Sequence, residues 1–278
     1  MRMILIFASA LLAIVGGCGS DSDDGRIDVI ATTTIGADIV RNVAGPDANV
    51  EALLPESASP HDYAASAKDR AQLEDADLVV AWGAGLEGGL PLDELGEEPL
   101  ELAAEERDPH VWMDPTLIAS VLPELATALG EADPDRAEAY EDRAAAYAHV
   151  LGRLDRRLGL SFRTIPPDRR KLVTSHDSLG HFVRRYDFDF VGAPFGIAPS
   201  AEPSAERVAS LIDRVEQEDV PAVFAEDTDD PELMRQIARE AGVEVVDDLL
   251  TEGFGGRVDS YESMLRYDAD RIVAALAP

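Results

Sequence analysis

Apolar and polar positions alternate along the first part of the chain in a repeating order. Short β-branched runs predict strands, and longer segments with apolar positions at helical spacing predict helices. The strands are expected at 27–31, 50–54, 76–82 and 100–103, and the helices at 32–43 and 64–74. Strands that alternate with helices are typical of a parallel α/β sheet.

A long helical stretch follows, and the α/β pattern then restarts. One helix is predicted over 115–129, and a second begins with Asp133 as N-cap and Pro134 at its first position. This second helix runs to about residue 160 and would span about 37 Å, more than the width of a small domain, so we interpret it as a rigid connector. In the second half, strands are expected at 171–174, 188–191, 222–225 and 243–246, and helices at 178–186, 204–218, 231–241 and 261–276.

These patterns predict an α/β fold class with two Rossmann-like lobes, each built on a parallel sheet and joined by a long rigid connector helix. We find no close sequence repeat between the two halves, so their similarity lies in the pattern alone. The expected organisation is a lipoprotein signal peptide at 1–17, a flexible tether at 18–25, an N-terminal α/β lobe at 26–132, the connector helix at 133–165 and a C-terminal α/β lobe at 166–278.

The N-terminus has the features of a targeting segment. Arg2 supplies a positive charge, the apolar stretch 3–15 is too short to span a bilayer, and two glycines precede Cys18. Small residues before a cysteine are typical of a bacterial lipobox, in which Cys18 is lipidated and becomes the mature N-terminus. An ordinary secretory signal is the alternative. We therefore expect the protein at the outer face of the cytoplasmic membrane, anchored through Cys18, which as the only cysteine forms no internal disulfide.

The chain is strongly acidic, with a net charge of -31 from 55 acidic and 24 basic residues. Such a protein repels nucleic acid and anionic lipid headgroups, so neither is expected as a partner. The composition fits either a salt-adapted organism or a GC-rich genome. An acidic surface also attracts divalent cations weakly and without defined geometry, which is the alternative to a specific metal site.

Three of the five histidines lie in loops marked by proline and aspartate: His61, His110 and His176. Neutral imidazole is the commonest protein ligand for borderline transition metals. Each of the three follows a predicted strand, and ligands of open parallel sheets bind beyond the carboxyl ends of the strands. The sequence therefore predicts one divalent metal site in the cleft between the lobes. For His149 and His181 we expect structural roles.

A carboxylate is expected as the fourth ligand. Asp247 and Asp248 follow the predicted strand 243–246, and Glu226 ends the strand before it. Neighbouring side chains in a strand point to opposite sides, so only one of the two aspartates would face the cleft. Glu226 is better suited to orienting an imidazole.

Four segments carry a resemblance to a known family. They are Pro60–Tyr63, Asp108–Pro115, Val173–Asp177 and Val245–Leu250. In this order they resemble the metal-binding segments of the zinc/manganese solute-binding lipoproteins of metal ABC importers. The resemblance implies two α/β lobes joined by a backbone helix, with one metal ion held between them by His61, His110, His176 and Asp248. It departs from the family at Leu249, where a small residue is usual, and in the absence of a histidine-rich loop at 83–98.

The predicted function is extracytoplasmic capture of one divalent metal ion per chain, zinc first and manganese second, for delivery to the permease of an ABC importer. We expect a monomer and no enzymatic activity. A membrane-anchored metal-dependent hydrolase is the alternative, but four protein ligands would close the coordination shell, and the chain has no His-Glu-x-x-His or Gly-x-Ser-x-Gly motif. A binder of organic solutes would need aromatic or arginine clamps, and the sequence offers no clear set.

Overall fold

The computed structural model describes residues 25–278, apart from residue 57, residue 105 and the segments 198–202 and 228–229. The predicted signal peptide and Cys18 therefore lie outside the described residues. Within the described part of the chain, no helix is both long enough and apolar enough to cross a membrane.

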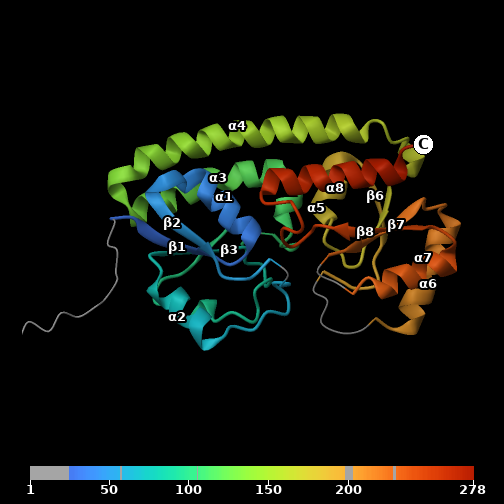
Figure 1. Ribbon diagram of the computed structural model, residues 1–278, viewed down its shortest axis with the longest axis horizontal. Helices are drawn as coiled ribbons and strands as arrows, with labels where there is room; N and C mark the ends of the chain where they lie inside the picture. The colour runs from blue at the N-terminus through green and yellow to red at the C-terminus, as the bar shows by residue number, and fades with distance from the viewer. Residues whose placement is uncertain (1–24, 57, 105, 198–202, 228–229) are drawn as a thin grey trace, which may run out of the picture.

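Four parallel strands in the order β2–β1–β3–β4 form the sheet of the first half. The strands are β1 (Ile27–Ala31), β2 (Ala48–Ala52), β3 (Leu78–Ala81) and β4 (Leu100–Glu101). Figure 1 shows α1 (Thr34–Ala44) on one face of this sheet and α2 (Ala67–Asp75) on the other. The hydroxyl of Thr33 accepts a hydrogen bond from the backbone N–H of Gly36 (3.1 Å) and so caps α1 directly after β1.

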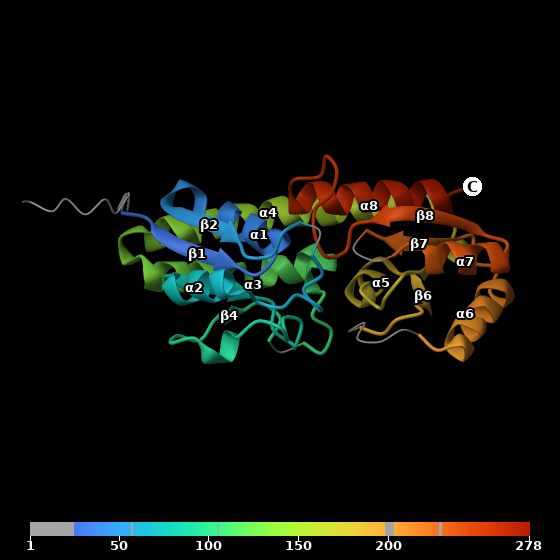
Figure 2. The ribbon, with the colours of Figure 1, turned by 60° about the horizontal axis from the view of Figure 1, so that its bottom comes forward.

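The strands of the second half form two parallel pairs. β5 (Lys171–Val173) pairs with β6 (Asp189–Gly192), β7 (Ala222–Glu226) pairs with β8 (Glu244–Leu249), and β5 packs beside β7. Figure 2 shows β6, β7 and β8 with the helices that flank them, α5 (Gly180–Tyr186), α6 (Ala205–Gln217) and α7 (Glu232–Ala241). We call β1–β4 with α1, α2 and α3 (Pro115–Ala132) the N-terminal lobe and β5–β8 with α5–α7 the C-terminal lobe.

The last strand contains a bulge. Phe224 pairs with Val246 and Glu226 pairs with Leu249, so β8 advances three residues where β7 advances two. Asp247 and Asp248 lie in this interval, and Asp248 has a φ of 63°, in the left-handed region. A bulge of this kind re-aims side chains and extends the strand by one residue.

Two long helices unite the halves. They are α4 (Ala137–Phe162), which follows α3, and α8 (Tyr261–Leu276), which closes the chain. Figure 1 shows α4 running along both lobes with α8 beside its C-terminal part. α4 buries one face at steps of three or four residues, formed by Tyr140, Ala144, Tyr147, Leu151, Leu154, Leu158 and Phe162. This face belongs to one hydrophobic core that includes residues of both lobes.

Short 3-10 turns complete the structure. They are η1 (Gly45–Asp47), η2 (Leu92–Glu94), η3 (Val111–Met113), η4 (Pro134–Arg136) and η5 (Pro167–Arg169). The turn η4 replaces the first turn of the predicted connector helix. There the carboxylate of Asp133 accepts hydrogen bonds from the side chains of Arg136 (2.5 Å) and Tyr140 (2.9 Å) instead of capping backbone N–H groups.

The predicted fold class is confirmed: parallel α/β lobes are joined by one long helix. Strand β2 begins two residues before the predicted run 50–54, and β8 continues three residues past the predicted end at 246. The boundaries at 26–132, 133–165 and 166–278 stay a prediction, because one core passes through all three segments.

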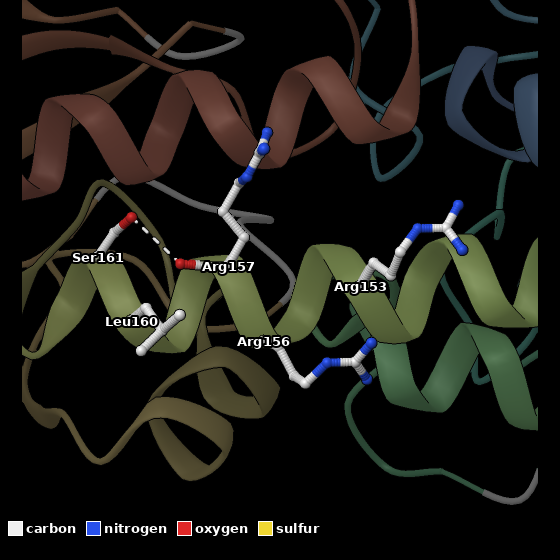
Figure 3. Close-up of a pocket in the computed structure, with 5 residues that line it drawn as sticks. All are labelled: Arg153, Arg156, Arg157, Leu160 and Ser161. Atoms are coloured by element: carbon white, nitrogen blue, oxygen red, sulfur yellow. Dashed lines mark hydrogen bonds between the residues drawn. The ribbon is translucent and has the colours of Figure 1, made fainter.

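The shared core yields a first testable prediction. Leu151 of α4 is fully buried (0% exposed), whereas Leu160 is 62% exposed on the outer face of the same helix. Figure 3 shows Leu160 on α4 with Arg153, Arg156 and Arg157, which line the same surface pocket. We expect Leu151→Ala to lower the free energy of unfolding by about 2–5 kcal/mol, because it leaves a cavity in the core. Leu160→Ala should change it by less than about 0.5 kcal/mol. Urea unfolding of both variants tests this, and equal losses would contradict it.

Candidate metal centre

Four side chains from loops at strand ends meet between the two lobes. His61 lies in a turn after β2, His110 lies between β4 and η3, His176 follows β5, and Glu252 follows β8. In Figure 2, β1 and β8 run toward each other, so the loops beyond their carboxyl ends face across the middle of the molecule. This is where ligands bind to open parallel sheets.

The four side chains place one nitrogen or oxygen atom each in a compact cluster. Nε2 of His110 lies 3.3 Å from Nε2 of His61 and 3.3 Å from Nε2 of His176. Oε1 of Glu252 lies 3.1 Å from Nε2 of His61 and 3.4 Å from Nε2 of His176. All four atoms lie within 4.8 Å of one another, and among the described residues no other set of three or more histidine, cysteine or acidic side chains is gathered this closely.

The cluster is almost closed to solvent. His110, His176 and Glu252 are at most 3% exposed, and the side chain of His61 is 4% exposed. Acidic surface residues that attract cations diffusely do not have this burial. The geometry therefore favours a specific site over the diffuse alternative.

Two carboxylates, the buried Glu226 and the partly buried Asp108, orient two of the imidazoles. Nδ1 of His110 lies 2.7 Å from Oδ1 of Asp108, which also accepts the backbone N–H of His110 (3.1 Å). Nδ1 of His176 lies 2.8 Å from Oε2 of Glu226. A neutral imidazole that donates its proton through Nδ1 carries its lone pair on Nε2. The lone pairs of His110 and His176 therefore both point into the cluster.

Glu226 is fully occupied by these supporting contacts. Its carboxylate accepts hydrogen bonds from the backbone N–H of His176 (3.1 Å) and from the hydroxyls of Ser178 (3.2 Å) and Thr251. Its own backbone N–H donates to the hydroxyl of Ser175 (3.1 Å). Glu226 thus holds the loop of His176 in place and does not enter the cluster, as its suitability for orienting an imidazole indicated.

Burial and neighbouring charge act in opposite directions on the carboxyl groups. Burial raises the pKa of Glu252, but the hydrogen bonds and charges of His176 and His61 outweigh it and hold the pKa well below its usual range. The same balance lowers the pKa of Glu226 beside His176 and that of Asp108 beside His110. Burial lowers the pKa of His110 more than the hydrogen bond to Asp108 raises it. At neutral pH the acids are therefore ionised and His110 is neutral.

This arrangement has a clear chemical use. Nε2 of His110 and Nε2 of His176 lie 3.3 Å apart with lone pairs converging, and two acceptors cannot hydrogen-bond to each other. A cation between the two nitrogens removes the repulsion between their lone pairs, because both lone pairs can then bind it. Tetrahedral zinc with bonds of about 2.0–2.1 Å separates its ligand atoms by about 3.3 Å. The four contacts of 3.1–3.4 Å between neighbouring atoms of the cluster match this spacing.

Asp248 does not join the three imidazoles, contrary to the expectation from the sequence. It is exposed in the bulge of β8, at a backbone φ of 63°, and is not among the clustered side chains. Asp247 is partly buried and pairs with Arg235 (3.2 Å), so it does not contribute either. The structure places Glu252 in the fourth position instead.

The sequence carried one signal for Glu252. The β-branched and aliphatic run that begins at Val243 resumes after the two aspartates and continues through Leu250. If that run is read as one strand with a bulge, the first carboxylate beyond its end is Glu252, followed by Gly253. The sequence prediction ended this strand at residue 246. It therefore placed the following loop, and the expected fourth ligand, several residues before Glu252.

The other residues singled out in the sequence have structural contacts. His149 is exposed on α4. Nε2 of His181 donates to the backbone oxygen of Asp108 (2.9 Å) and so supports the loop of His110. Asp114 caps α3 by accepting the backbone N–H of Thr116 (2.8 Å).

Two parallel α/β lobes on a connector helix, with a buried donor set between them, define a metal-binding protein. The chain belongs to the family described as zinc-uptake complex component A, periplasmic, whose model matches residues 29–275. It is therefore a metal-binding extracytoplasmic component of an ABC importer. This confirms the resemblance stated from the four segments, and it confirms a transport protein rather than an enzyme.

Individual relatives agree with the family. The chain is 29% identical to the manganese-binding lipoprotein MntA of Halalkalibacterium halodurans, over 99% of both chains. It is 30% identical to the zinc-binding protein TroA of Treponema pallidum, over 91% of this chain and 90% of that one. The solved structure of TroA superposes with a TM-score of 0.84 at 28% identity, covering 91% of this chain and 100% of the other.

A matched pair of variants tests the fourth position. We expect Glu252→Gln to weaken zinc binding at least about tenfold, because the amide lacks the negative charge that attracts the ion. Asp248→Asn removes the same charge outside the cluster and should leave the affinity within about twofold. Competition with a chelating dye measures both. A loss with Asp248→Asn alone would restore the assignment made from the sequence.

Proposed function

We propose that this protein captures one zinc ion outside the cell and delivers it to the permease of an ABC importer. The observation that carries the proposal is the cluster of three imidazole nitrogens and one carboxylate oxygen, in which four neighbouring pairs of atoms lie 3.1–3.4 Å apart and all four atoms lie within 4.8 Å of one another. His61, His110, His176 and Glu252 are the proposed ligands. Zinc is the transported cargo, so the site has to hold it firmly and also give it up.

The donor set supports zinc ahead of manganese. Three nitrogens and a single carboxylate suit zinc, whereas manganese prefers sites richer in oxygen. The general order of affinity also places zinc above manganese. The relatives do not separate the two metals, since one is named manganese-binding and another zinc-binding. Manganese is therefore the second candidate, and it would require both oxygens of Glu252 or added water.

The expected location follows from the N-terminal motif and from the relatives. The run Gly16-Gly17-Cys18 supports lipidation at Cys18, and the relative from Halalkalibacterium halodurans is named a lipoprotein. We propose that the chain works as a monomer tethered to the outer face of the cytoplasmic membrane. The tether would keep the captured ion close to the permease.

Delivery requires at least one ligand to move, and His61 is the best placed to do so. Asp108 and Glu226 hold His110 and His176 through their Nδ1 atoms, whereas among the described residues no side chain bonds Nδ1 of His61. His61 also lies in a turn, where the residue as a whole is partly exposed although its imidazole is 4% exposed. We propose that contact with the permease displaces this turn first, while the shared core keeps the lobes in place.

Metal analysis tests the proposed function directly. Protein purified without added metal should contain about one zinc per chain after exposure to equimolar zinc and manganese, because the nitrogen-rich donor set prefers zinc. Elemental analysis gives the ratio, and His110→Ala should abolish it. A protein that retains manganese in preference to zinc would reverse the choice of metal. No stoichiometric metal in the unaltered chain would refute the proposal.

Zinc affinity should fall in acid. Imidazoles must be neutral to bind the ion, so protons compete with zinc below the ordinary imidazole pKa of about 6.5. Burial lowers the pKa of His110, and the histidine partners of Glu252, Glu226 and Asp108 lower the pKa of these three carboxyl groups. All four groups are therefore largely deprotonated at neutral pH, before zinc binds. We expect little change between pH 8 and 7 and a fall of at least about tenfold per unit below about pH 6. Titrations in metal buffers measure this, and constant affinity down to pH 5 would contradict a histidine-based site.

A further inference from the structure

Trp112 connects the two lobes beside the metal centre. It lies in η3, two residues after His110, and is 1% exposed. Its indole Nε1–H donates to the backbone oxygen of Thr251 in the C-terminal part of the chain (2.6 Å). Its own backbone oxygen accepts the hydroxyl of Tyr261 (2.5 Å). A residue of the His110 loop is therefore bonded to the loop that carries Glu252.

Thr251 directly precedes Glu252 and is fully buried. Its hydroxyl donates to Glu226, the carboxylate that orients His176. The neighbouring backbone N–H of Leu250 donates to the buried carboxyl of Asp268 (2.9 Å). The hydroxyl of Thr251 and the N–H of Leu250 thus hold the loop to the C-terminal part of the chain, and the Trp112 bond holds it to the N-terminal lobe.

We infer that Trp112 is a positioning residue for the metal ion. Its hydrogen bond to Thr251 holds the Glu252 loop against the His110 loop, so that a carboxylate oxygen of Glu252 stays within 4.8 Å of a ring nitrogen of His110 and both atoms can bind one cation. Ring contact strengthens the link, because the Trp112 ring lies 5.2 Å from the His110 ring, centroid to centroid. This inference rests on the proposed function, since it assumes that Glu252 and His110 share an ion.

The chain contains its own control. Trp82 is the only other tryptophan, it is also 1% exposed, and its ring lies 4.5 Å from that of Trp112. Its indole N–H donates to the hydroxyl of Thr33 (2.9 Å), so its bond stays within the N-terminal lobe. Trp82→Phe and Trp112→Phe remove the same group from the same aromatic cluster. Only the second breaks a bond to the Glu252 loop.

The test compares zinc affinity in the full chain, stripped of metal and titrated against a chelating dye. We expect Trp112→Phe to raise the dissociation constant about tenfold, the size of effect that supporting contacts around a metal have. Trp82→Phe should stay within about twofold. With cobalt as a probe, Trp112→Phe should weaken the visible absorption of a four-coordinate ion, because Glu252 no longer completes the shell. The Trp82 variant should keep the spectrum of the unaltered chain.

A measurement on the unaltered chain covers the case in which Trp112→Phe does not fold. The two indole N–H signals are assigned with Trp82→Phe, and their hydrogen exchange is followed without and with zinc. Zinc should slow exchange at Trp112 at least about tenfold and leave Trp82 unchanged, because only Trp112 is bonded to a loop that the ion fixes. The inference would be overturned if the two variants had equal zinc affinities and equal cobalt spectra. It would also be overturned if the hydrogen-exchange rate of the Trp112 indole did not change when zinc was added. Failure of the unaltered chain to bind zinc would instead refute the proposed function.

Discussion

The site depends on buried imidazoles being held with their lone pairs inward. The carboxylates of Asp108 and Glu226 accept from the Nδ1–H groups of His110 and His176, and the Nε2 atoms of the two rings then face each other 3.3 Å apart. Without a cation this arrangement is unfavourable, since it brings acceptors together in a medium of low dielectric. The fold must therefore supply the opposing energy, and the shared core behind the loops is its source.

The same constraint explains why the surrounding polar groups are so densely connected. A buried carboxylate is costly unless several donors satisfy it. Glu226 meets this condition with backbone and hydroxyl donors from Ser178, Thr251 and the His176 loop. Each hydrogen bond that stabilises the buried charge of Glu226 also fixes the position of the loop that supplies the donor. The same donor groups therefore set the geometry of the cluster.

The sequence predicted most of the fold and three of the four clustered side chains. The helix over 261–276 and the strand over 27–31 have the predicted bounds because their apolar spacing is regular and their ends carry clear signals. His61, His110 and His176 were found because few histidines occur and each follows a strand. Asp248 was misplaced because a bulge has no simple sequence pattern, and a strand with two acidic residues in it looks like a strand followed by a loop. The Trp112 bond to Thr251 joins positions 139 residues apart, which spacing alone cannot relate.

The depth of the cluster governs how long an ion stays. All four proposed ligand side chains are at least 96% shielded from water, so an ion bound among them would leave only when a loop opens. Escape is then set by the rate of loop opening rather than by the strength of the bonds alone. Such a protein retains its ion while it diffuses and releases it where another protein opens the loop. The residence time of the ion then depends on contact with that second protein and not on the metal-binding protein alone.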